Sequence, residues 1–206
     1  MIDVLQNGIS MFFLYAVAAV FTQNAVFSRA LGVSRLVKLV EDPTVDTLIF
    51  SGLLCIIQVI AGVLSFFVNK LFGVALSAAR FYVRPLLLVL CTIAAFLIVL
   101  VFIILFYKQN AARQIVDVLP IATFNCCVLG TVLITVTKNY TLLQTIAFAI
   151  GSALGYVMAV MLVTEGQRTL KNRNIPQSFK GLPATLVYIG VLALALYGFT
   201  GHMPVF

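Results

Sequence analysis

Two adjacent cysteines follow an asparagine in an otherwise apolar stretch of the chain. Asn125, Cys126 and Cys127 come five residues after Pro120, and Gly130 closes the stretch. Thiolates are the usual ligands of iron–sulfur clusters. Asparagine and glycine interrupt helices, and proline removes one backbone donor. One hypothesis is therefore a metal ligand at Cys126 beside a helix break; the alternative is that buried cysteines pack as small apolar side chains.

A similar polar interruption lies near the start of the chain. It reads Thr22-Gln23-Asn24, followed by AVFSRALG up to Gly32, so both interruptions contain Thr-x-Asn and end in a glycine. Irregular backbone at membrane depth is tolerated only where protein or a cavity covers it. We therefore expect the two segments to face each other or a partner subunit. The alternative is that Asn24 and Asn125 form only interhelical hydrogen bonds.

The composition explains why these segments are expected inside a membrane. Of the 206 residues, 63% are hydrophobic and 9% are charged, whereas a soluble domain is about 45–50% apolar and about 25% charged. Six runs without Asp, Glu, Lys or Arg are long enough to cross roughly 30 Å of hydrocarbon as helices. They cover residues 4–28, 47–69, 85–107, 118–137, 139–164 and 181–206.

The positions of the two interruptions predict the fold. One lies in the first run and the other in the fourth, so each half of three runs begins with a broken helix. Three helices per half make the halves enter from opposite faces, which is typical of an inverted repeat. The sequence predicts an all-α, polytopic membrane protein with six transmembrane helices, an inverted 3+3 repeat and a single domain over residues 1–206.

The basic residues predict the orientation. The net charge is +7, and the links after the odd-numbered runs hold nine basic residues, against four in the other links. Basic residues gather on the cytoplasmic side of short loops, so both termini are predicted outside. The nine are Arg29, Arg35, Lys38, Lys108, Arg113, Arg168, Lys171, Arg173 and Lys180; the four are Lys70, Arg80, Arg84 and Lys138.

The remaining candidates carry less chemistry. Cys55 and Cys91 each stand alone in an apolar run, where packing is the better explanation. None of the six acids falls inside a predicted span, and no phosphate loop or zinc-protease motif occurs. Gly151 and Gly155 form a GxxxG pattern, which predicts close packing against another helix.

Several longer stretches resemble one family. LPIATFNCCVLG (residues 119–130), NAVFSRALGVS (residues 24–34) and NIPQSFKGLPATLVYIGVLALALYGFTG (residues 174–201) are similar, in order, to segments of the Rnf-Nqr membrane subunits. The resemblance is closer to RnfA than to NqrE, RnfE or NqrD. It implies a membrane subunit that pairs with an RnfE-like sister subunit, and with other Rnf-type subunits, in a bacterial inner membrane.

The resemblance also implies a cofactor and an activity. The pair of sister subunits would share an iron–sulfur centre, and the complex would move electrons between ferredoxin and NAD while translocating Na⁺ or H⁺. Cys126 matches one family ligand. The other family ligand, the cysteine of an LGxC pattern, is replaced here by Ser34, so Ser34 would bind through oxygen, Cys127 or a partner residue would compensate, or the centre would be absent.

Three functions remain open on the sequence alone. The first is an RnfA-like membrane subunit of a redox-driven, ion-translocating electron transport complex, not catalytic by itself. The second is a small secondary transporter built on an inverted repeat, whose broken helices bind a solute or ion. The third is an RnfA-like scaffold subunit that has lost the metal centre. In the first two, the helix-break site comprises Asn24, Gly32, Asn125 and Gly130.

Overall fold

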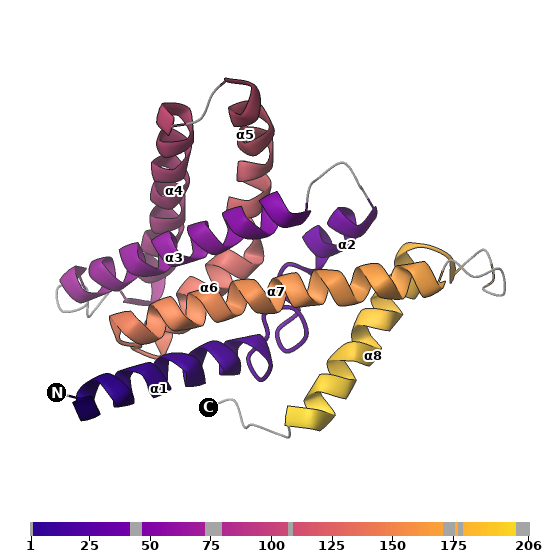
Figure 1. Cartoon of the computed structure of the whole chain (residues 1–206), viewed down its shortest axis with the longest axis horizontal. Helices are drawn as coiled ribbons and strands as arrows, with labels where there is room; N and C mark the ends of the chain where they lie inside the picture. Colours follow the sequence, from indigo (N-terminus) through magenta and orange to yellow (C-terminus); the bar gives the residue numbers. More distant parts are fainter. Residues whose placement is uncertain are drawn as a thin grey trace.

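The computed structural model describes residues 2–41, 47–72, 80–106, 109–170, 176 and 179–200, and these form helices, turns and no strand. Figure 1 shows the arrangement of the helices. In chain order they are α1 Ile2–Val20, α2 Val33–Glu41, α3 Thr47–Phe72, α4 Arg80–Phe106, α5 Gln109–Thr123, α6 Cys126–Thr137, α7 Leu142–Leu170 and α8 Leu182–Thr200.

Fewer of these helices can span a membrane than the sequence predicts. Within the described residues, three helices are long and apolar enough to cross a bilayer, and a fourth span arises if α5 and α6, bent by 48°, count together. The apolar parts of α1 and α8, Gly8–Val20 and Leu182–Gly198, are shorter. The chain is a multi-pass, all-helical membrane protein, and the six-helix inverted repeat stays a prediction.

The first predicted span is shorter as a helix because its own polar residues end it. The hydroxyl of Thr22 donates to the carbonyl of Ala18 at 2.7 Å, and the amide of Asn24 donates to the carbonyl of Val20 at 2.8 Å. Side chains that bind these last carbonyls compete with the backbone donors that would continue the helix. Turns therefore occupy residues 21–32 before α2 begins.

One carboxylate lies closer to a span than expected. Asp117 is exposed within α5, and the apolar part of the bent pair already begins at Ile115. Asp117 therefore lies in the first turn of this span, at its end, rather than in the link before it. The sequence boundary at residue 118 was set by the charge itself, whereas the helix runs through it without a break.

The core forms where α3 and α7 cross the other helices. α3 and α7 lie side by side, α1 packs along α7, and α4 stands beside α5 (Figure 1). Tyr156, Phe50 and Ile57 are among the largest fully buried side chains. The GxxxG pattern of α7 packs as predicted: a Cβ on Gly151 would overlap the backbone of Ala16, and one on Gly155 would lie 3.3 Å from the Cα of Val20.

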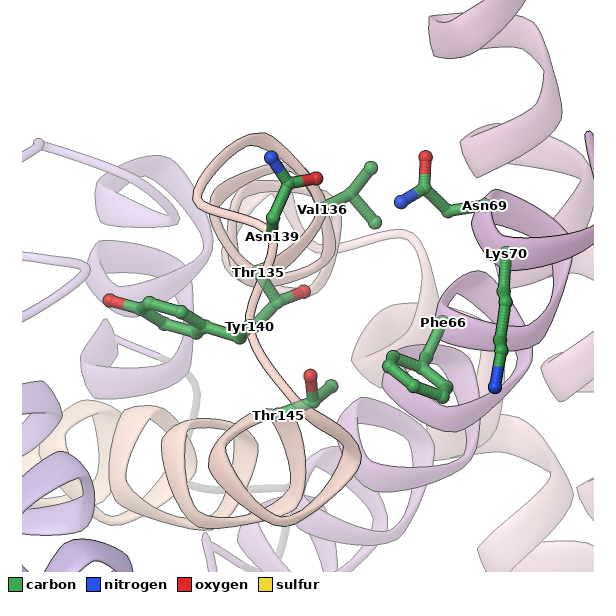
Figure 2. Close-up of a pocket in the computed structure, with 8 residues that line it drawn as sticks. All are labelled: Phe66, Asn69, Lys70, Thr135, Val136, Asn139, Tyr140 and Thr145. Carbon is green, nitrogen blue, oxygen red and sulfur yellow. The ribbon is translucent and has the colours of Figure 1, made fainter. Parts of the chain in front are cut away.

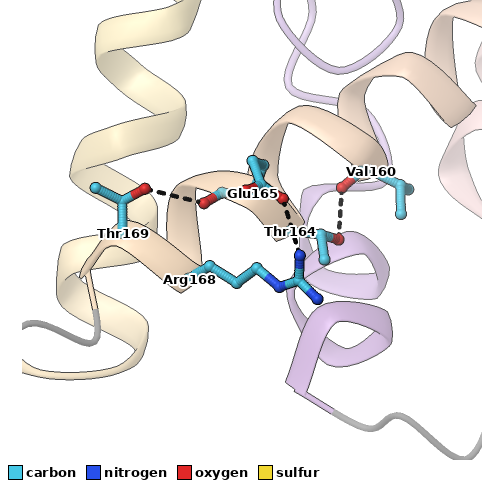
Figure 3. Close-up of polar contacts among 5 residues, drawn as sticks. All are labelled: Val160, Thr164, Glu165, Arg168 and Thr169. Carbon is cyan, nitrogen blue, oxygen red and sulfur yellow. Dashed lines mark hydrogen bonds and ion pairs between the residues drawn. The ribbon is translucent and has the colours of Figure 1, made fainter.

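The last turns of α7 carry exposed charged side chains. α7 has 29 residues, more than the roughly 20 needed to cross the hydrocarbon. Near its end, Arg168 forms an exposed ion pair with Glu165 at 3.5 Å, and the hydroxyl of Thr169 donates to the carbonyl of Glu165 (Figure 3). An exposed pair of this kind adds little stability.

Candidate functional site: two helix breaks in contact

The first break is organised by a single buried asparagine. The side-chain oxygen of Asn24 accepts from the backbone N–H groups of Val26 at 2.9 Å and Phe27 at 3.2 Å. Its side-chain nitrogen donates to the carbonyl of Val20, and also to that of Gly155 in α7 at 3.2 Å. Every polar atom of this side chain is thus paired, and the break is fixed to α7.

The second break uses the same local chemistry in a shorter form. The hydroxyl of Thr123 donates to the carbonyl of Leu119 at 2.8 Å, four residues back, just as Thr22 does in the first break. The side-chain oxygen of Asn125 then accepts from the N–H of Cys127 at 3.1 Å and caps α6. Asparagine is among the preferred N-cap residues because it satisfies such free N–H groups.

The two breaks touch each other. Gly32 has a φ of +77°, and a Cβ placed there would lie 2.7 Å from both the side-chain oxygen of Asn125 and the ring of Tyr156. A Cβ on Gly130 would likewise overlap the side chain of Leu31. Both glycines of the predicted pattern are therefore positions where one break approaches the other too closely for a larger residue.

Tyr156 joins the two breaks, and sequence analysis did not identify it. Its hydroxyl donates to the carbonyl of Gly32 at 3.2 Å, and its ring is fully buried beside Phe50. The GxxxG pattern of α7 does not indicate it, because Tyr156 directly follows Gly155 and so points about 100° away from the glycine face, toward Gly32 and Phe50. Tyr156 positions the first break against α6.

The cysteines of the second break point to different environments. α6 begins at Cys126, so Cys126 and Cys127 are successive residues of a regular helix and point in different directions. Cys126 is exposed, whereas Cys127 is buried. The sulfur of Cys127 accepts from the amide of Gln58 at 3.1 Å and lies 3.7 Å from the hydroxyl of Ser152.

These donors fall short of a complete metal site. Ser34 is exposed, as Cys126 is, and the contact between Gly32 and Asn125 places both near the junction of the breaks. Within the part of the chain that the structure describes, no group of three or more His, Cys, Asp or Glu residues is arranged to hold a metal ion. Iron–sulfur clusters normally take four cysteine thiolates, so one exposed thiol and one hydroxyl do not fit such a cluster by themselves.

The fold and the site define a multi-pass helical membrane protein with two contacting helix breaks. Comparison with known proteins gives the family: residues 12–203 match the family described as "Rnf-Nqr subunit, membrane protein". The chain belongs to the Rnf-Nqr family of membrane subunits.

Named relatives come from ion-translocating oxidoreductase complexes. The chain is 29% identical to the A subunit of the Na(+)-translocating ferredoxin:NAD(+) oxidoreductase complex of Acetobacterium woodii, over 90% of this chain and 94% of the relative. It is 26% identical to the A subunit of the ion-translocating oxidoreductase complex of Shewanella baltica, over 92% and 97%. It is 30% identical to the E subunit of the Na(+)-translocating NADH-quinone reductase of Chlamydia trachomatis, over 56% and 48%.

Proposed function

We propose that this chain is an RnfA-type component of an ion-translocating electron transport complex in a bacterial inner membrane, with both termini outside. The complex would carry electrons across the membrane between ferredoxin and NAD sites on other subunits. The observation that carries the proposal is the contact of the two breaks at Gly32 and Asn125, in a chain whose relatives of similar length are the A subunits of such complexes.

The exposed surface around the two breaks favours contact with a partner subunit. Ser28, Arg29 and Ala30 are exposed in the irregular first break, and Phe124 and Cys126 are exposed at the second. Backbone that lacks helical hydrogen bonds is not stable against hydrocarbon, so protein should cover this surface. An RnfE-like sister subunit fits, because the same surface then becomes the junction between two membrane subunits.

The iron–sulfur centre is proposed only as a shared one. Cys126 presents a thiol at this junction, and Ser34 presents a hydroxyl. A serine hydroxyl is far harder to deprotonate than a thiol, so a centre here would depend on partner residues for its other thiolates. The interior position of the Cys127 sulfur, among Gln58 and Ser152, favours a partner residue over Cys127 as the compensating ligand.

A scaffold role is the second candidate, and the same two residues favour it. Ser34 in place of a cysteine and the inward position of Cys127 leave this chain with one outward thiol at the breaks. The chain would then hold the helices of the complex in place without carrying electrons. A transporter working alone is a weaker candidate, because the named relatives are subunits of larger complexes.

Purification of the complex separates these functions. Iron content and electron transfer from ferredoxin to NAD would be measured in complexes with the wild-type chain, Cys126→Ala and Ser34→Cys. If Cys126 is a ligand, Cys126→Ala lowers both iron content and electron transfer, whereas Ser34→Cys preserves or raises iron content. Equal iron and equal electron transfer in all three complexes would support the scaffold. Solute uptake by the isolated chain in liposomes would support the transporter.

A further inference from the structure

Polar side chains from three helices meet along one buried seam, away from the surface that carries Cys126. Residues four or seven positions apart lie on the same face of a helix, and each helix contributes such a set. The seam consists of Gln58, Ser65 and Asn69 of α3, Cys127, Thr131 and Thr135 of α6, and Thr145 and Ser152 of α7. All except Asn69 are buried.

The hydrogen bonds in the centre of the seam can be assigned one by one. Thr131 donates its hydroxyl proton to the carbonyl of Cys127 at 2.8 Å. Its contact with Ser152 at 2.9 Å therefore uses the proton of Ser152. The amide nitrogen of Gln58 donates to the Cys127 sulfur at 3.1 Å and to the Thr131 hydroxyl at 3.3 Å.

One acceptor in this network has no partner. The side-chain oxygen of Gln58 is buried and accepts no hydrogen bond from the residues that the structure describes. Exchanging its oxygen and nitrogen only moves the deficit to the nitrogen. A second unpaired atom, the side-chain nitrogen of Asn125, lies two residues before Cys127. An unpaired buried group destabilises the fold, and more so in a membrane interior, where no bulk water can bind it.

The seam ends in an open cavity. A cavity of about 190 Å³ is lined by three seam residues, Asn69, Thr135 and Thr145, together with Phe66, Lys70, Val136, Asn139 and Tyr140. Figure 2 shows these side chains around the ends of α3 and α6 and the start of α7. At about 30 Å³ per molecule, the cavity has room for several water molecules. It gives the seam an opening at the side of Lys70 and Lys138, which is the side predicted to face outside.

We propose that the seam between α3, α6 and α7 binds water and connects the cavity at Asn69 and Thr145 with Cys127. Water can donate to the Gln58 oxygen and accept from the Asn125 nitrogen, so the same ligand satisfies both kinds of unpaired atom. The seam then forms an aqueous path from one membrane face to the second break. This path does not depend on an electron transfer role for the chain.

The competing explanation is that the seam is dry and only holds the helices together. Hydroxyl groups on membrane helices often bond to carbonyls of their own helix, as Ser65 does with Gly62 at 2.8 Å and Thr135 with Val132 at 2.9 Å. A dry seam predicts that Cys127 is as unreactive as any buried cysteine. A hydrated seam and a dry seam therefore predict different reactivities for the native Cys127 thiol.

Thiol modification in the assembled complex tests the proposal. A small charged methanethiosulfonate reagent would be added separately to each face of sealed vesicles, and modified cysteines would be identified by tandem mass spectrometry. Thiolates form where water reaches them, so Thr135→Cys and native Cys127 should react at least about tenfold faster than Val132→Cys. Val132 is a matched control, because it is fully buried on the same helix and faces the apolar core. Native Cys91, buried in α4, is an internal control.

The side of access and a second variant complete the test. Reaction should occur from one face only, the face that also labels Lys138→Cys, since Lys138 is exposed beside the cavity. Gln58→Met removes the unpaired oxygen while keeping the length of the side chain, and should slow the modification of Cys127 but not that of Thr135→Cys. The proposal would be overturned if Thr135→Cys and Cys127 reacted no faster than Val132→Cys. It would also be overturned if the reagent modified them equally fast from both faces. Unchanged Cys127 reactivity in Gln58→Met would overturn it as well.

Discussion

The two helix breaks begin with the same residues and differ in how completely they are satisfied. In the first, residues 21–32 form turns, and all polar atoms of the Asn24 side chain are paired. In the second, only two residues separate α5 from α6, and the side-chain nitrogen of Asn125 is buried without a partner among the described residues. The first break is therefore a self-contained structural element, whereas the second still has hydrogen-bonding capacity for a ligand or a partner.

The largest expected effect is that of Asn24→Ala. The change removes the bonds to Val20, Gly155, Val26 and Phe27. Since each buried group left unpaired costs about 1–3 kcal/mol, we expect a loss of about 3–5 kcal/mol in stability. Thermal unfolding of the complex in detergent would measure it. The comparison between the breaks fails if Asn125→Ala is equally damaging.

A somewhat smaller effect is expected for Gly32→Ala, which tests the contact between the breaks. The positive φ of +77° disfavours alanine, and the new Cβ would meet Asn125 and Tyr156 at 2.7 Å. Backbone strain and overpacking together should cost about 2–4 kcal/mol. The matched control is Gly181→Ala, because Gly181 has a φ of +83° and a Cβ there would meet no atom of the described residues within 4 Å. If both variants lower the unfolding temperature equally, the contact between the breaks adds no cost to that of the backbone strain.

Asn125→Ala should have a moderate effect. It removes one capping bond to the N–H of Cys127, and loss of an asparagine N-cap costs about 1 kcal/mol. Part of that cost is offset because the unpaired side-chain nitrogen also disappears. Chemical or thermal denaturation of the complex gives the value. A loss above that of Asn24→Ala would show that the second break carries more of the structure.

Tyr156→Phe should have the smallest effect. The change removes the hydrogen bond to the carbonyl of Gly32, at 3.2 Å, while the buried ring is kept. A neutral hydrogen bond contributes about 0.5–1.5 kcal/mol. Tyr156→Ala is the informative companion, because it also removes the ring packed against Phe50 and should cost several times more in the same unfolding assay. If the two variants behave alike, the hydroxyl rather than the ring joins the breaks.

Local chemistry explains what could be predicted from the sequence. A long run without charged residues indicates a membrane span whatever the rest of the chain is. The helix interruptions are also local, because they depend on bonds to residues two to four positions away, made by Thr22, Asn24, Thr123 and Asn125. The positions of both breaks were therefore predictable. The extent of the first break was not, because the apolar run continues to residue 28 whereas α2 begins only at Val33.

Tertiary structure decided which residues meet at the site. The bond between Asn24 and Gly155 spans 131 residues, and that between Tyr156 and Gly32 spans 124. Spacing along a chain carries no information on such contacts, since they depend on how α7 crosses α1 and α6. The same holds for the cysteines: the sequence places Cys126 and Cys127 side by side, and only the packing of α6 against α3 and α7 turns Cys127 inward and leaves Cys126 exposed.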